Sequence, residues 1–139
     1  MRTLAPTDVA VGDALPPVDI PITATLIVSG AIASRDFQDV HHDATLARQR
    51  GAGDIFMNIL TTNGLVGRYV TDWAGPEAIL RNVAIRLGSP NYPGDVMRLT
   101  GMVERAEGDE VAVSIRGTTA LGEHVSGTVT LTLPGKGKP

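Results

Sequence analysis

The sequence contains no cysteine. This absence excludes disulfide bonds, zinc sites built on thiolates, iron–sulfur clusters and a thiol nucleophile. Aromatic residues are scarce as well, at 4%, whereas glycine is abundant, with 16 residues. We therefore expect a core of valine, isoleucine, leucine and alanine side chains, with many tight turns between the elements.

The chain also lacks an excess of basic residues and a long hydrophobic run. Lys and Arg together number 12 against 15 Asp and Glu, a net charge of −3, which argues against a nucleic-acid-binding protein. The most apolar stretch, residues 24 to 33, has about half of the roughly twenty residues that a membrane-spanning helix needs. Acidic residues precede it, so it does not resemble a signal peptide. We predict a cytoplasmic protein with neither membrane nor nucleic acid as a partner.

The length of 139 residues fits one domain, and folding would bury about two-thirds of the surface of the extended chain. Residues 1 to 18 contain several prolines and little periodicity, which predicts an N-terminal loop. We place the folded domain at residues 19 to 133. The remaining residues, 134 to 139, are expected to form a flexible tail.

One long apolar helix is predicted over residues 54 to 73. Apolar side chains recur there at spacings of three and four and cover much of the helix circumference, so we expect this helix to be deeply buried. Asp54 is expected to cap its first turn, and Gly75 with Pro76 to end it. Two shorter helices are predicted over residues 24–34 and 44–50.

The last half of the chain alternates apolar and polar residues, which is typical of strands with one buried face. The predicted strands cover residues 20–22, 78–87, 96–104, 111–115 and 125–133. An antiparallel sheet curved around one apolar helix is the hotdog plan, and the sequence therefore predicts a single α+β hotdog domain.

The most polar segment of the first half, residues 35 to 43, holds Asp36 and, five residues later, His41. An imidazole titrates near neutral pH, and a carboxylate can orient it or share a water molecule with it. Such a pair can move protons. Taken alone the pair is weak evidence, since Asp and His at this spacing occur in many surface loops.

The surrounding residues resemble the signature of the MaoC-like, or hydratase-2, family of enoyl-CoA hydratases. That signature is Asp, any residue, Asn, Pro, an aliphatic residue, His, five residues and Ala, and Asp36, Val40, His41 and Ala47 match it. Pro93-Gly94-Asp95 resembles the family's turn before a strand. The sequence departs from the family at four positions, with Arg35 for Gly, Gln38 for Asn, Asp39 for Pro and Asn58 for Gly.

Residues 35–43 and 68–76 resemble a branch of this family in which a small subunit pairs with a larger MaoC-like subunit. The resemblance implies a heterodimer or heterotetramer that hydrates a steroid side-chain enoyl-CoA in sterol and cholesterol degradation. It implies that Asp36 and His41 bind one water molecule between them and supply the acid and the base. Backbone N–H groups at the start of the long helix would receive the thioester oxygen.

Three residues are predicted to bind substrate: Asn58, Gln38 and Gly53. Asn58 lies near the start of the long helix, where its amide is either a donor to the substrate or part of the helix surface. Gly53 belongs to the turn Gly51-Ala52-Gly53, which precedes the expected helix and could hold phosphate there. No metal and no cofactor are expected, because CoA is part of the substrate.

Other interpretations stay open at this point. The enzyme alternative is a hotdog acyl-CoA thioesterase, and the non-enzyme alternative is a hotdog subunit that only completes a partner's acyl tunnel. A metal site could be assembled from His41, His42, Asp39 and Asp43, although the spacing matches no known motif. An arginine could bind the CoA phosphates, and His124 is expected at a strand edge. The candidate arginines are Arg68, Arg81 and Arg86.

Overall fold

The computed structural model describes residues 1–135, and all its regular elements lie within that range. The five strands are β1 (Ala14–Pro21), β2 (Ile79–Leu87), β3 (Val96–Glu107), β4 (Glu110–Thr119) and β5 (Gly122–Thr132). The helices are α1 (Ala24–Ala33), α2 (Ala44–Gln49) and α3 (Ile59–Ala74), with short 3-10 turns η1 (Pro6–Asp8) and η2 (Asp39–His41).

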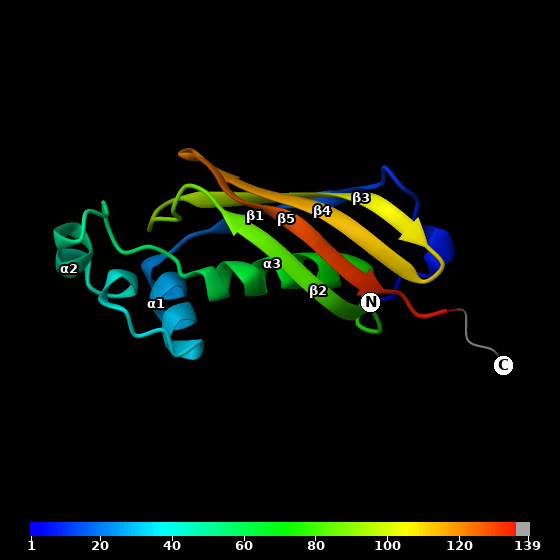
Figure 1. Cartoon of the computed structure of the whole chain (residues 1–139), viewed down its shortest axis with the longest axis horizontal. Coiled ribbons are helices and arrows are strands. Elements are labelled where there is room, and N and C mark those ends of the chain that lie inside the picture. Colours follow the sequence, from blue (N-terminus) through cyan, green and yellow to red (C-terminus); the bar gives the residue numbers. More distant parts are fainter. Residues whose placement is uncertain (136–139) are drawn as a thin grey trace.

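The strands form one antiparallel sheet in the order β1-β3-β4-β5-β2, and the sheet curves over α3 (Figure 1). The smaller helices α1 and α2 gather at one end of the sheet, beside the start of α3 (Figure 1). This is the predicted α+β hotdog arrangement. Among residues 1–135, none of the helices is long and apolar enough to cross a membrane.

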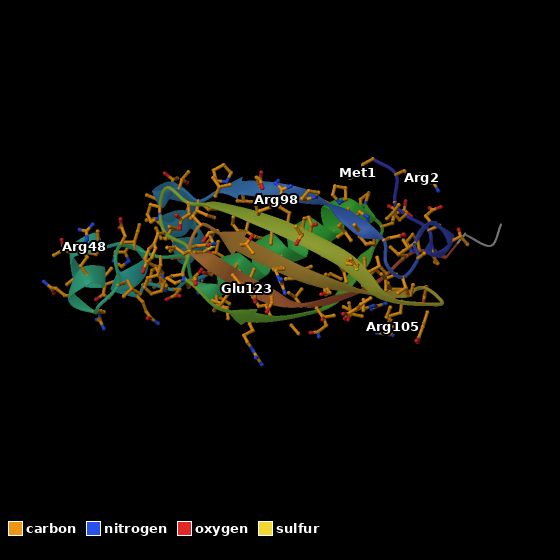
Figure 2. The ribbon with its side chains drawn as sticks, turned by 90° about the horizontal axis from the view of Figure 1, so that it is seen from above. Met1, Arg2, Arg48, Arg98, Arg105 and Glu123 are labelled. Carbon is orange, nitrogen blue, oxygen red and sulfur yellow. The ribbon has the colours of Figure 1, made fainter. Side chains whose placement is uncertain are left out.

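The core lies between α3 and the concave face of the sheet. On β3 the predicted alternation is confirmed, since Met97, Leu99 and Val103 are buried while their neighbours along the strand are largely exposed. Val66 and Val70 of α3 are completely buried against this face. The polar side chains that alternate with the core residues cover the outer face of the sheet (Figure 2).

The predicted loop over residues 1–18 is wrong in its second half, because β1 begins at Ala14 and runs to Pro21. The two prolines in its middle, Pro16 and Pro17, suggested a loop. They are tolerated because β1 is an edge strand whose pairing with β3 is interrupted between Leu15 and Val18. Of the predicted tail, residues 136–139 lie outside the described residues.

The long helix begins five residues later than the pattern predicted, at Ile59. Ile55 and Phe56 continue the apolar spacing of the helix, but the backbone of this stretch bonds to other segments instead. Phe56 N donates to Val40 O at 3.1 Å, and Met57 N donates to Asn91 O at 3.1 Å. Asn58, rather than Asp54, therefore caps the helix. This extended stretch holds the start of α3 against the polar segment 35–43.

Gly127 of β5 pairs with Ile85 of β2, where the two backbones leave no room for a side chain. A Cβ there would collide with the carbonyl of Ala84 and the Cα of Ile85, both backbone atoms that cannot rotate away. A Cβ at Gly64 on α3 would meet nothing within 4 Å. The two glycines therefore form a matched pair for substitution.

We expect Gly127→Ala to lower the free energy of unfolding by about 1–3 kcal/mol, because overpacking against backbone forces the strands apart. Gly64→Ala should instead raise it by about 0.5–1 kcal/mol, since alanine loses less conformational entropy in a helix than glycine. Urea denaturation of the two variants and the natural chain measures both changes. Equal stability of the two variants would contradict the close β2–β5 approach.

Candidate active site

A cavity of about 300 Å³ opens at the N-terminal end of α3. Its walls come from the polar segment 35–43, the start of α3, the β2–β3 loop and β5. The lining residues are Asp36, Gln38, His41, Phe56, Met57, Asn58, Ile59, Leu87, Gly88, Pro90 and His124.

The structure brings together the two residues that the motif singled out. Asp36 Oδ2 lies 3.2 Å from His41 Nε2. His41 is buried, and its Nδ1 lies 2.7 Å from the carbonyl oxygen of Phe56. Because a carbonyl only accepts, Nδ1 carries a proton, and in the neutral form of the ring Nε2 holds a lone pair. In that form Asp36 and His41 each present an acceptor at the cavity wall to which a water molecule can donate.

The turn before Asp36 contains Arg35, one of the departures from the family signature. Arg35 has a φ of +55°, the left-handed region that glycine occupies without a steric penalty. The turn is held by Asp36 N, which donates to Ala31 O at 2.9 Å as α1 ends. The backbone thus keeps the shape that favours glycine, although arginine, which has a Cβ, occupies the position.

Asn58 is buried and links the helix to the carboxylate. Its Oδ1 accepts from Thr61 N at 3.0 Å, which caps α3. Its Nδ2 donates to Asp36 Oδ2 at 3.1 Å and to Ser34 Oγ at 2.9 Å. Asn58 is therefore not part of an exposed helix surface, and its two amide protons already have acceptors. The geometry makes it an orienting partner of Asp36, while direct contact with substrate stays a prediction.

The other predicted site residues divide between the cavity and its surroundings. Gln38 lines the cavity, and its backbone N–H lies 3.4 Å from Asp36 Oδ1. Gly53 does not line it, and its N–H instead donates to the Tyr92 hydroxyl at 3.3 Å. A role for Gly53 in substrate binding stays a prediction. His42 is exposed and is not part of the lining.

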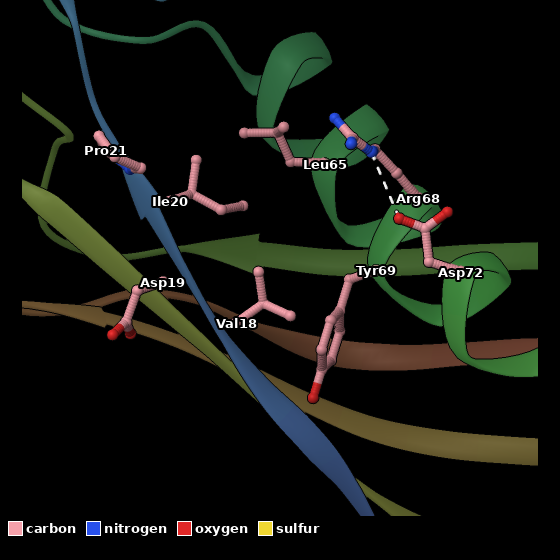
Figure 3. Close-up of a pocket in the computed structure, with 8 residues that line it drawn as sticks. All are labelled: Val18, Asp19, Ile20, Pro21, Leu65, Arg68, Tyr69 and Asp72. Atoms are coloured by element: carbon pink, nitrogen blue, oxygen red, sulfur yellow. Dashed lines mark hydrogen bonds and ion pairs between the residues drawn. The ribbon is translucent and has the colours of Figure 1, made fainter.

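The residues considered for a metal site have other partners. Asp39 accepts from Arg50 at 2.8 Å, and Asp43 caps α2 by accepting from Leu46 N at 3.0 Å. In the part of the chain that the structure describes, no three His, Cys, Asp or Glu side chains come together to hold a metal ion. The arginines considered for CoA phosphate, Arg68, Arg81 and Arg86, are all exposed and lie outside the cavity lining. Arg68 instead lines a separate pocket between α3 and β1, where its Nε lies 3.4 Å from Asp72 Oδ2 (Figure 3).

His124 is the residue that sequence reasoning placed wrongly. It was expected at a strand edge, but it is 1% exposed and lines the cavity. The β4–β5 register passes from Gly117↔Val125 to Thr118↔Glu123, so His124 is an extra residue on β5. This bulge lets His124 and Val125 both point inward. Burial lowers the pKa of the His124 imidazole, so its neutral form is favoured.

Comparison with known proteins identifies the family. No family model matches the sequence. The chain is 47% identical over 123 residues to the 3-oxo-4,17-pregnadiene-20-carboxyl-CoA hydratase beta subunit of Mycobacterium tuberculosis, covering 88% of this chain and 95% of that protein. The chain belongs to the MaoC-like hydratase family.

Solved structures agree with this membership. A chain from the crystal structure of the ChsH1–ChsH2 complex from Mycobacterium tuberculosis superposes with a TM-score of 0.88 at 46% identity, covering 90% of this chain and 98% of that one. The R-hydratase PhaJ1 from Pseudomonas aeruginosa also gives 0.88, at 19% identity, with 96% and 88% covered. At that identity the second likeness shows the hotdog fold alone.

In this MaoC-like chain we expect Asn58→Asp to separate capping from orientation. Aspartate can still accept from Thr61 N, so the free energy of unfolding should fall by no more than about 1 kcal/mol. The Nδ2 donor to Asp36 is lost, however, and a second carboxylate faces the first, so kcat for enoyl-CoA hydration should fall at least about tenfold. Denaturation and steady-state kinetics measure the two effects. Unchanged kcat would show that Asp36 needs no such donor.

Proposed function

We propose that this chain is the catalytic small subunit of a 2-enoyl-CoA hydratase that acts on a steroid side-chain thioester. The observation that carries the proposal is the 3.2 Å contact of Asp36 with His41 at the wall of an open cavity. The proposal is supported by 47% identity to a protein named as a steroid carboxyl-CoA hydratase beta subunit. Sterol or cholesterol degradation is the pathway class that such a substrate fits.

The geometry supports a simple addition of water. A water molecule that donates to Asp36 and His41 is held with its oxygen free to attack Cβ of the enoyl thioester. The pair takes one proton from that water and returns one proton to Cα, so the C=C bond becomes C–O and C–H and the protein regains its starting state.

Negative charge develops on the thioester oxygen during the addition. The first N–H groups of a helix have no intrahelical partner, and α3 begins at Ile59 on the cavity wall. Asn58 caps one of them, that of Thr61. The remaining N–H groups of this turn and the positive end of the helix dipole are suited to stabilise an oxyanion. The proposed addition of water uses no metal and no cofactor, since CoA is part of the substrate. The absence of a cofactor stays a prediction.

We propose a larger MaoC-like subunit as the partner, in a heterodimer or heterotetramer. The related protein is named a beta subunit, and the related structure is titled a two-component complex. The surface of this chain is consistent with a partner, because Leu60, Ile79 and Leu80 are exposed large apolar side chains on α3 and the edge strand β2. A cytoplasmic location stays a prediction.

Two other functions remain as outcomes of the same assay. A hotdog thioesterase would release free CoA, and a non-catalytic subunit would show no turnover of its own. The site favours hydration, because Asn58, Phe56 and the turn at Arg35 all orient the Asp36–His41 pair. A non-catalytic subunit that only completes the acyl tunnel of its partner would need no oriented Asp36–His41 pair.

We expect Asp36→Asn and His41→Ala each to lower kcat by about 100-fold or more, the usual contribution of a general acid or base. Loss of enone thioester absorbance on the purified complex measures hydration. His42→Ala is the matched control, since His42 is exposed and lies outside the cavity lining. Losses below about fivefold in both site variants, or a larger effect at His42, would overturn the assignment.

The acyl group is the second testable part of the proposal. A four-ring ligand buries far more apolar surface than a crotonyl group, at about 25 cal/mol per Å². The expectation rests on this buried area, because the exposed Gly64 and the buried Gly67 both lie outside the cavity lining. We therefore expect a higher kcat/KM for a steroid enoyl-CoA than for crotonyl-CoA on the complex. Equal values would leave a generic enoyl-CoA hydratase.

A further inference from the structure

The cavity has two walls that are far apart in sequence, and one buried side chain joins them. One wall is the start of α3, which carries Asn58 and faces Asp36. The other is the β2–β3 loop, which carries Gly88 and Pro90. His124 reaches both, since its Nε2 lies 2.9 Å from Thr62 Oγ1 in α3 and its Nδ1 lies 2.7 Å from Ser89 O in the loop.

The two hydrogen bonds fix the state of the ring. Ser89 contributes a carbonyl, which only accepts, so Nδ1 carries the proton. Nε2 then holds a lone pair and accepts from the hydroxyl of Thr62. The neutral ring therefore satisfies both of its nitrogens, in agreement with its lowered pKa. A buried imidazole with two directed bonds is a rigid spacer between the elements that it joins.

The backbone of β5 holds the same loop. Gly88 N donates to His124 O at 2.7 Å, and Ser89 N donates to Glu123 O at 2.8 Å. A Cβ at Gly88 would collide with the Glu123 carbonyl, so the loop packs against β5 with no room for a side chain at this position. Backbone hydrogen bonds thus fix the loop relative to β5. The side chain of His124 then fixes the same loop relative to α3.

We propose that His124 is a positioning residue of the hydration site, which sets the distance between the start of α3 and the β2–β3 loop. The inference rests on the proposed hydratase function, because the distance matters only if a substrate must be held between these walls. On one wall lie the helix N–H groups suited to the thioester oxygen, and Asn58 on the same wall orients Asp36. A shift of the walls therefore separates the oxyanion donors from the bound acyl group.

Removing the ring while keeping its bulk should affect turnover more than binding. His124→Leu leaves the carbonyl of Ser89 and the hydroxyl of Thr62 without their partners, so the loop and the helix are free to move apart. Misplacement of reacting groups by about 1 Å can cost up to about 100-fold in rate. We expect kcat to fall at least about tenfold, with KM within about threefold of the natural chain.

Two further variants distinguish positioning from packing. In His124→Asn the side-chain amide can donate to Ser89 O but cannot replace the Nε2 bond to Thr62, so we expect kcat to fall severalfold, less than in His124→Leu. Thr62→Val conserves shape but removes the hydroxyl, and kcat should fall severalfold. His42→Leu is the matched control, the same substitution at an exposed imidazole outside the cavity lining.

The experiment measures kcat and KM for one enoyl-CoA on the complex with its partner, well below the thermal unfolding temperature of every variant. The inference is overturned if His124→Leu keeps kcat within about threefold, or if His124→Asn is as impaired as His124→Leu. Should His124→Leu fail to fold, an unchanged kcat in Thr62→Val overturns it. A natural complex that hydrates no enoyl-CoA contradicts the proposed function itself, whereas an active complex insensitive to these changes contradicts only the role of His124.

Discussion

The side-chain amide of Asn58 is the interaction on which the rest of the site depends. Through Oδ1 it caps α3, and through Nδ2 it holds Asp36 and Ser34. The point where the helix begins and the direction in which the carboxylate points are therefore set by one planar group. Because Asn58 is buried, loss of the bond at either end of its amide would leave a buried polar atom without a partner, which is costly. The helix of the core and the chemistry at its end are fixed together.

Much of the fold was predictable because its strongest signals are periodic. The strands β3, β4 and β5 alternate apolar and polar residues, and each buried face is the one that the alternation indicated. The start of α3 was not predictable in this way. Ile55 and Phe56 fit the helical spacing, but the N–H groups of Phe56 and Met57 donate to Val40 O and Asn91 O, and such long-range bonds leave no local signal.

The site shows the same division. Asp36 and His41 were found because both lie in one short segment with a recognisable pattern, and Asn58 was singled out as a departure from the family. His124 was missed because a bulge inverts its direction, and a bulge depends on the partner strand β4 rather than on the residues beside it. Gly53 lies outside the cavity lining, and the helix expected directly after its turn begins only at Ile59, so a role in substrate binding stays a prediction.

The prolines of β1 limit how this sheet can grow. Both ends of the strand order are open edges, but Pro16, Pro17 and Pro21 leave β1 without N–H donors at three of its positions. The opposite edge, β2, contains no proline. Pairing through β2 of two chains closes as a pair, whereas a filament would also need β1 as a template, and the missing donors make β1 a poorer one. The residues that interrupt β1 therefore also make open-ended aggregation less favourable.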